Sequence, residues 1–242
     1  SPFSTSKLLQ TAGNMFNISP KHIMNICQKL YQAGYITYMR TESTKYSKVF
    51  IEGVNDYIIS KYGAEYGNIN DNIINKNINN PHEAIRVTNL NNTYAKNDKD
   101  PFLSKIYKLI YTNTIESCMK PYTANITIVK ITSPFKEHYY EYKNEIPIYY
   151  GWKIIKLNTE NIDTTKGMLL YFKSICTSTN NIEYKKIEAC VNISTNTHYY
   201  SEHSLINKLE SLGIGRPSTF ATIVDVIQSR NYVEKKNIEA KE

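Results

Sequence analysis

The amino-acid sequence predicts a multidomain protein of α and β structure, with a helical N-terminal part, a β-rich middle and a helical C-terminal part. Before residue 121, apolar residues recur at helical spacing. The middle of the chain is rich in β-branched and aromatic residues, and helical spacing returns after Tyr200. We therefore expect three domains, at residues 1–121, 122–198 and 199–242.

The first two helices are predicted from apolar stripes and capping residues. The helix expected at residues 3–16 has an apolar stripe formed by Leu8, Leu9, Ala12 and Phe16. For the second helix, Ser19 is a good N-cap, Pro20 suits the first helical position, and Gly34 is expected to end it.

The rest of the N-terminal part alternates short extended segments, loops and helices. Residues 35–40 are β-branched and aromatic, and they are too few for another helix, so we expect an extended segment. Helices are expected at 47–62 and 102–119, and the Asn-rich stretch 67–80 is expected to be a surface loop.

Strands are predicted in the middle part, and two helices follow them. Residues 124–131 and 167–175 are expected to be strands, with residues 151–155 between them in this β-rich part. Residues 201–212 and 217–229 are expected to form two helices around a glycine-containing turn, as in a helix-turn-helix.

Composition indicates the class of partner only weakly. The net charge of +7 and the pI near 9.0 are typical of proteins that bind polyanions, although a Lys-rich and Asn-rich composition alone could give the same charge. The four cysteines lack the short spacing of zinc ribbons, so no metal is assigned to them, and Cys27 is expected to be a buried, reduced core thiol. No stretch is apolar enough to span a bilayer, which favours a soluble, intracellular protein.

The segment from Gly34 to Ser43 carries the clearest candidate chemistry. In an extended segment Tyr38 and Arg40 would project from the same face. A tyrosine hydroxyl can act as a nucleophile, and a neighbouring guanidinium can stabilise the charge that develops on a phosphodiester. The alternative is a packed aromatic ring beside a surface charge.

The second candidate cluster lies at residues 82–88. His82, Glu83 and Arg86 would share a helical neighbourhood at this spacing, and the histidine could donate a hydrogen bond to a phosphate. The alternative is a solvated helix end with a Glu–Arg pair.

The third candidate cluster is the turn at residues 213–220. Glycines followed by Arg216, Ser218 and Thr219 at a helix start can bind phosphate, because free backbone amides point outward there. The alternative is an ordinary capped turn.

Taken together and in this order, the three clusters resemble the type IA DNA topoisomerases, in particular those of the bacterial topoisomerase I type. The resemblance extends over nearly the whole chain, from Pro2–Ser6 through the Gly151-Trp152 pair to Val233. Met39, between the tyrosine and the arginine, is similar to topoisomerase I, whereas the topoisomerase III branch typically has proline there. Glu42 stands where the family commonly has Asp, and Val87 where it usually has Pro.

The resemblance implies a fold and a role for each matched residue. The fold would be a fragment of a toroidal core, with a helical nucleophile domain, a β-rich arch segment and a helical base segment. Tyr38 would be the nucleophile, Arg40 the contact to the scissile phosphate and His82 a phosphate ligand. DNA contacts would come from Glu42, Arg86, Arg216, Ser218 and Thr219.

The resemblance also implies a reaction. The intact enzyme would cleave one DNA strand through a 5′-phosphotyrosine, pass a strand through the break and reseal it, so that negative supercoils relax without ATP. Mg²⁺ would be held by a Toprim domain outside this chain, and the chain alone is expected to bind no metal, to be a monomer and to be inactive. The alternative function is a non-catalytic module that binds single-stranded DNA.

Overall fold

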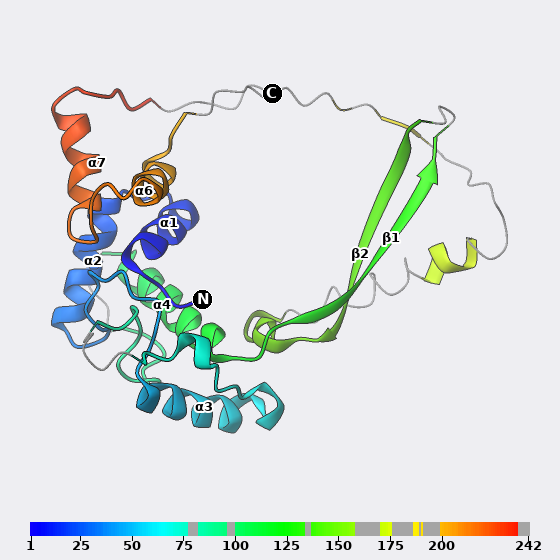
Figure 1. Ribbon diagram of the computed structural model, residues 1–242, viewed down its shortest axis with the longest axis horizontal. Coiled ribbons are helices and arrows are strands. Elements are labelled where there is room, and N and C mark those ends of the chain that lie inside the picture. Colours follow the sequence, from blue (N-terminus) through cyan, green and yellow to red (C-terminus); the bar gives the residue numbers. More distant parts are fainter. Residues whose placement is uncertain are drawn as a thin grey trace. The chain divides into compact units, whose positions relative to one another are not determined.

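The computed structural model describes residues 1–76, 82–95, 100–133, 137–157, 170–175, 186–188, 190 and 199–236. The chain divides into two compact units, one formed by Ser1–Met119 with His198–Glu242 and the other by Lys120–Thr197. Figure 1 shows the first unit as a group of helices and the second as a long ribbon of two strands. The C-terminal helices therefore pack in one unit with the N-terminal helices, and the division into three domains stays a prediction.

The first two helices, α1 (Thr5–Phe16) and α2 (Pro20–Gln32), form where the sequence predicts them. Ser4 and Ser19 are their N-caps, and each side chain accepts a hydrogen bond from the amide three residues later. Because the first amides of a helix have no partner within it, these bonds stabilise both helix starts.

Two further helices, α3 (Lys48–Tyr62) and α4 (Leu103–Cys118), complete the N-terminal part and match the predicted spans closely. α4 packs against α2 and α3, α1 packs against α2, and the buried stripes of these four helices form the core. Its side chains include Leu8, Leu9, Ile23, Ile26, Leu30, Ile51, Ile58, Ile106, Ile110 and Ile115. Burial of each such side chain contributes about 1.5–3 kcal/mol, so this core is a main source of stability.

Cys27 is buried in this core as a free thiol, as predicted. Burial raises its pKa to about 12, because an apolar surrounding disfavours the thiolate. The thiol is therefore a packing group and not a nucleophile.

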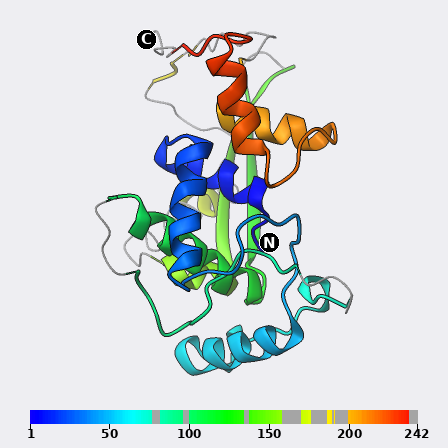
Figure 2. The ribbon, with the colours of Figure 1, turned by 90° about the vertical axis from the view of Figure 1, so that its left-hand side faces the viewer.

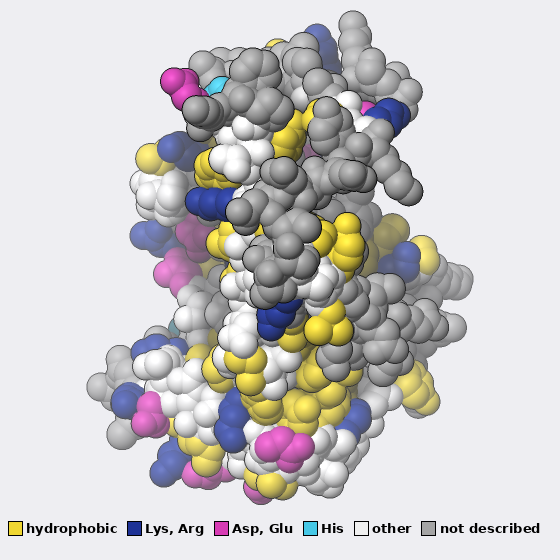
Figure 3. All heavy atoms as spheres, turned by 90° about the vertical axis from the view of Figure 1, so that its right-hand side faces the viewer, with side chains coloured by type: hydrophobic (Ala, Val, Ile, Leu, Met, Phe, Trp, Pro, Cys, Tyr) yellow, Lys and Arg dark blue, Asp and Glu magenta, His cyan; other side chains and the backbone are white. Residues whose placement is uncertain are grey.

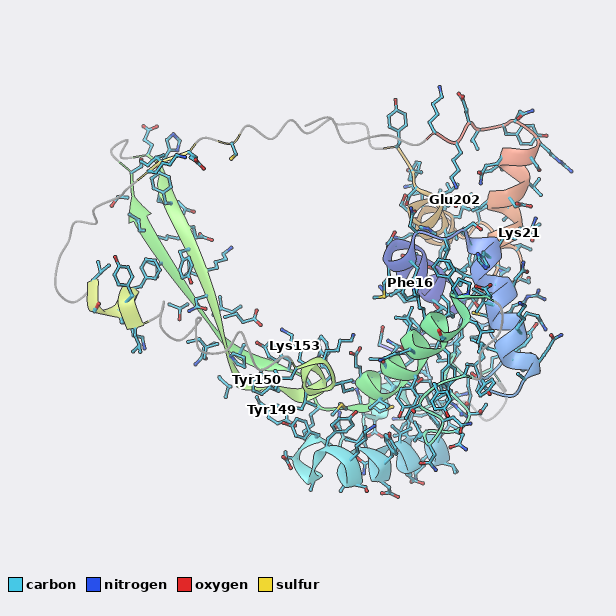
Figure 4. All side chains as sticks on the ribbon, turned by 180° about the vertical axis from the view of Figure 1, so that it is seen from behind. Phe16, Lys21, Tyr149, Tyr150, Lys153 and Glu202 are labelled. Carbon is cyan, nitrogen blue, oxygen red and sulfur yellow. The ribbon has the colours of Figure 1, made fainter. Side chains whose placement is uncertain are left out.

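The C-terminal helices α6 (Glu202–Ser211) and α7 (Phe220–Ser229) pack on the first two helices, α6 on α1 and α7 on α2. Figures 1 and 2 show this arrangement. An ion pair of 2.9 Å joins Lys21 Nζ on α2 to Asp225 Oδ2 on α7, and both Lys21 and Glu202 are labelled in Figure 4. The unit is thus built from segments far apart in sequence.

The contact between α1 and α6 depends on a glycine. A Cβ added to Gly13 would overlap the imidazole ring of His203, so the ring fills the space that a side chain would need. His203 is buried, and its Nδ1 has no hydrogen-bond partner among the described residues. Loss of hydration on burial lowers the pKa of His203 below its ordinary value, which keeps the ring neutral in this contact.

The second unit contains β1 (Thr123–Thr132) and β2 (Tyr139–Tyr149), which pair antiparallel. The ribbon exposes apolar side chains at Ile126, Ile128 and Ile148. In the view of Figure 3, hydrophobic and basic side chains lie side by side on the surface. Because an isolated two-stranded ribbon is marginally stable in water, contacts beyond the strand pairing must support it.

Aromatic and charged side chains supply such contacts. The rings of Tyr142 and Phe172 lie 4.7 Å apart between centroids. Lys153, labelled in Figure 4, has its Nζ 3.5 Å from the Tyr122 ring centroid and 3.0 Å from Glu145 Oε1. These contacts support both ends of the ribbon.

The strand predicted at residues 167–175 is wrong over residues 170–175. Residues 151–155 belong to a 3₁₀ helix, η3 (Gly151–Lys156), and residues 170–175 are helical, while 167–169 lie outside the described residues. Gly151 adopts a φ of +47° and leaves no room for a side chain beside the Pro121 backbone, so the chain turns sharply there. Conversely, the sequence pattern did not predict β2.

The Asn-rich stretch 67–80 contains more local structure than a plain surface loop. A short 3₁₀ helix, η1 (Ala64–Tyr66), precedes it, a second, η2 (Asp71–Ile73), lies within it, and Ile74 forms a parallel bridge with Tyr46. Residues 77–80 lie outside the described residues. In the described parts of the chain, no helix has both the length and the hydropathy needed to cross a membrane.

Candidate active site

The segment that carries the expected nucleophile, residues 36–43, is a loop, called the nucleophile loop below. A backbone bridge and hydrogen bonds to Thr5 and Arg86 attach it to the rest of the unit. Ile36 pairs with Val87 in an isolated antiparallel bridge, and the chain is irregular from Thr37 to Glu42. The predicted alternation nevertheless holds locally, because Tyr38 and Arg40 are exposed while Met39 between them is fully buried.

The helix expected around residues 82–88 is wrong. This segment is extended, and Ile85 pairs with Phe3 on one side while Val87 pairs with Ile36. The amide of Ile85 donates to the carbonyl oxygen of Phe3 at 2.8 Å. Pairing with distant segments decides the conformation here, and the helical spacing of His82 and Arg86 is coincidental.

An open pocket of about 320 Å³ lies in the first unit and joins the three clusters. Its lining comes from the nucleophile loop, from His82 and from the turn before α7, and consists of Tyr38, Arg40, Thr41, Glu42, Ser43, His82, Pro217 and Ser218. A second pocket of about 160 Å³ shares Tyr38, Thr41 and His82 with it. The structure therefore brings five of the predicted site residues together: Tyr38, Arg40, Glu42, His82 and Ser218.

Tyr38 is accessible at this pocket, with 41% of its surface exposed. Its ring makes an edge-to-face contact with Tyr31, with the two centroids 5.4 Å apart. This geometry is a favourable one for aromatic pairs, so the contact supports the ring while leaving it open to the pocket.

The turn before α7 supplies Arg216 at the edge of the pocket. Its Nε lies 3.9 Å from Glu42 Oε1, and both side chains are exposed. The hydroxyl of Thr219 accepts a hydrogen bond from the Arg216 amide at 2.8 Å, so Thr219 closes the turn. Gly213 and Gly215 have φ values of +70° and +83°, which favour glycine and explain both glycines of the motif.

Arg86 is placed differently from the other predicted contacts. Its Nε donates to Glu83 Oε2 at 2.7 Å, and its guanidinium lies 3.7 Å from the Phe50 ring centroid. It is absent from the lining of both pockets around Tyr38. A DNA contact by Arg86 stays a prediction.

Glu83 joins this arginine to the start of α3. Its Oε1 accepts a hydrogen bond from the amide of Ser47, the N-cap, at 3.1 Å. Burial alone would raise the pKa of Glu83, but the hydrogen bonds from Ser47 and Arg86 outweigh it and hold the pKa below its ordinary value. The charged Glu83 side chain therefore links Arg86 to the start of α3.

The sequence analysis missed two threonines, Thr5 and Thr37, whose hydroxyls hold the nucleophile loop. Thr37 lies within the segment Gly34–Ser43, but nothing in that segment indicates an anchoring role for its hydroxyl. Thr5 lies at a helix start, where a threonine usually serves as a cap. Their role depends on partners more than thirty residues away.

The described residues contain no group of three or more His, Cys, Asp or Glu side chains that could hold a metal ion. Of the carboxylates at the two pockets, Glu42 lies near Arg216 and Glu83 is bonded to Arg86.

The fold and the pocket together define a class of protein. A family model described as DNA topoisomerase matches residues 1–242, and the chain belongs to the type IA DNA topoisomerase family. It is 35% identical over 247 residues to the DNA topoisomerase 1 type prokaryotic of Acanthamoeba polyphaga mimivirus. It is also 35% identical over 253 residues to DNA topoisomerase 1 of Rickettsia typhi.

The structure of full-length topoisomerase I from Thermotoga maritima is similar over 97% of this chain, with a TM-score of 0.71 and 26% identity. The chain covers 39% of that structure. The two sequence matches extend over 96% and 97% of this chain but over only 29% and 32% of the relatives. The chain therefore spans about a third of the length of the curated relatives it matches.

Proposed function

We propose that the intact protein is a type IA DNA topoisomerase in which this chain supplies the nucleophile and part of the surface that binds single-stranded DNA. One observation carries the proposal. Three segments far apart in sequence line a single pocket in one compact unit, and together they contribute Tyr38, Arg40, His82 and Ser218.

The proposed reaction is a reversible transesterification. The Tyr38 oxygen attacks a backbone phosphorus and loses its proton, a tyrosine–phosphorus bond forms, and the bond from phosphorus to the 3′-oxygen breaks. The leaving 3′-oxygen takes up a proton and becomes a free hydroxyl, while the 5′ side of the break stays attached to Tyr38. Because the phosphotyrosine bond conserves the energy of the broken bond, resealing and relaxation of negative supercoils need no ATP.

The pocket offers two groups that could assist this attack. Arg40 is always charged and can hold two phosphate oxygens with its planar guanidinium, which stabilises the charge of the transition state. His82 can donate a hydrogen bond to a non-bridging oxygen. Both line the same pocket as Tyr38.

The turn at residues 213–219 is the proposed contact to the continuing strand. Arg216 is 68% exposed in its side chain, and Ser218 lines the pocket. We expect binding to favour single strands and to weaken with salt, because phosphate contacts release counterions.

The remaining parts of the proposal concern the intact protein. Strand passage would take place through the transient break. Mg²⁺ would be held by acidic residues outside this chain, and the isolated chain would neither cleave nor relax DNA. The protein would act as a monomer, and the three predicted domains would be a nucleophile domain, an arch segment and a base segment.

The test is the covalent adduct of the intact enzyme with an end-labelled single strand, trapped by denaturant and separated on a gel. Tyr38→Phe should abolish the adduct and leave non-covalent binding nearly unchanged. Tyr31→Phe is the matched control, because Tyr31 is equally exposed and touches Tyr38 but lies outside both pockets. An adduct that persists in Tyr38→Phe, or that maps to another tyrosine, would exclude Tyr38 as the nucleophile and favour the non-catalytic binding module.

A further inference from the structure

The backbone between Tyr38 and Arg40 is held by the buried side chain of Thr5. The Thr5 hydroxyl donates to the carbonyl oxygen of Met39 at 2.6 Å, with the carbonyl oxygen of Thr41 also within 3.0 Å. The Thr5 hydroxyl oxygen also accepts a hydrogen bond from the amide of Thr41 at 2.8 Å. One hydroxyl thus spans the peptide units on both sides of Arg40.

Thr5 is itself fixed, because it is the first residue of α1. Its own amide donates to the Thr41 carbonyl oxygen at 2.9 Å, so the loop also satisfies a free amide at the helix start. Thr5 has no exposed surface, and water cannot take its place in these bonds. The loop is therefore attached to the rigid end of a core helix.

A second threonine holds the other end of the loop. The Thr37 hydroxyl accepts a hydrogen bond from the Arg86 amide at 3.0 Å and lies 3.1 Å from the carbonyl oxygen of Ala84, to which it can donate. The Thr37 amide donates to the Arg86 carbonyl oxygen at 2.9 Å. Tyr38, Met39 and Arg40 therefore lie between two backbone anchor points.

Neither Tyr38 nor Arg40 can be positioned by burial, since both side chains are exposed. The only buried side chain between them is that of Met39, which is apolar and fixes no hydrogen-bond direction. The Tyr31 contact supports the Tyr38 ring alone, so the placement of Tyr38 relative to Arg40 depends on the backbone that joins them. Misplacement of reacting groups by about 1 Å can lower a rate by about a hundredfold.

We propose that Thr5 is a positioning residue for strand cleavage, whose hydroxyl sets the backbone between the nucleophile Tyr38 and the phosphate-binding Arg40. This inference rests on the proposed function. Thr5 lines neither pocket around Tyr38, so it acts through the loop and not on the substrate.

The experiment compares Thr5→Val, which keeps the shape and removes the hydroxyl, with Thr5→Ser, which keeps the hydroxyl. Thr114→Val is the matched control, because Thr114 is equally buried but its hydroxyl donates to Ile110 of its own helix, and its other partner is Tyr46. Each variant of the intact enzyme is measured for its single-turnover cleavage rate, its non-covalent affinity for a single strand and the amide hydrogen exchange of residues 38–43.

In Thr5→Val we expect cleavage to slow by about ten- to a hundredfold, affinity to stay within about twofold, and exchange to accelerate in residues 38–43. Thr5→Ser should restore both the rate and the slow exchange, and Thr114→Val should change neither. Unchanged cleavage in Thr5→Val, or equal losses in Thr5→Val and Thr114→Val, would overturn the inference. A wild-type enzyme that forms no adduct would instead refute the proposed function, and unchanged exchange in Thr5→Val would still overturn the anchoring role of Thr5.

Discussion

The two sides of the pocket are built in opposite ways. On one side, the nucleophile loop lies on buried groups, with Ile36, Met39 and Thr41 inside the core and backbone bonds to α1 and to residues 84–87. On the other side, the turn at 213–219 is mostly exposed, and the side-chain hydrogen bonds of Arg216 and Thr219 stay within the turn. Under the proposed function, Tyr38 and Arg40 would need accurate placement at the reacting phosphate, whereas Arg216 would need reach along the strand.

The largest effect should come from removing the charge of Arg40 on the nucleophile loop. Arg40→Ala should lower the cleavage rate of the intact enzyme by about two to three orders of magnitude, because a preorganised charge is lost where the transition state needs it. Binding of a single strand should weaken far less. The measurement is single-turnover cleavage with a saturating labelled strand. A loss seen only in affinity would mean that Arg40 binds the strand, as proposed for Arg216, and does not assist cleavage.

The next largest effect should come from removing the charge of Glu83, and it should appear in the free energy of unfolding. Glu83→Gln should destabilise the folded protein by about 1–3 kcal/mol at pH 7, since the Ser47 amide and the Arg86 guanidinium lose a charged acceptor. Denaturant unfolding measures it. Glu52→Gln on α3 is the control, because its pair with Lys48 is exposed and 3.8 Å long, and it should cost about 0.5 kcal/mol or less.

The same carboxylate predicts a direction for the pH dependence. The folded-state pKa of Glu83 is lowered, so its contribution is fully present above the ordinary glutamate pKa of about 4.3 and is lost as the pH falls through the folded value. Unfolding measured between neutral pH and about pH 3 should therefore show less acid sensitivity in Glu83→Gln than in the wild type. Identical slopes would show that folding does not lower the pKa of Glu83.

The smallest effect should come from the exposed side. Arg216→Ala should weaken single-strand binding and reduce the slope of log affinity against log salt by about 0.7, the value for one phosphate contact on a single strand. The chemical step at saturating DNA should change little. A titration at several salt concentrations measures this, and an unchanged slope would mean that Arg216 contacts no phosphate.

Much of the helical part could be predicted from the sequence because its signals are local. Ser19 and Pro20 fix the start of α2 within a few residues of chain, and the three motifs identify most of the side chains that line the pocket. Two of the failures have non-local causes. Residues 82–88 have helical spacing but pair with Phe3 and Ile36, and the sharp turn at Gly151 depends on the Pro121 backbone.

The contribution of Thr5 was out of reach for the same reason. Its sequence neighbourhood predicts only a helix start, and its partners Met39 and Thr41 lie more than thirty residues further on. A motif shows which side chains react, but the hydrogen bonds that place them are visible only in three dimensions.

The close approach of α1 and α6 has a consequence for how the protein can vary. Gly13 and His203 share one volume, so a larger residue at position 13 is tolerable only with a smaller one at position 203. Each substitution alone should be harmful, the first through overlap and the second through a cavity, while a suitable pair should be nearly neutral. Positions 13 and 203 are therefore expected to covary among related proteins, although 190 positions separate them along the chain.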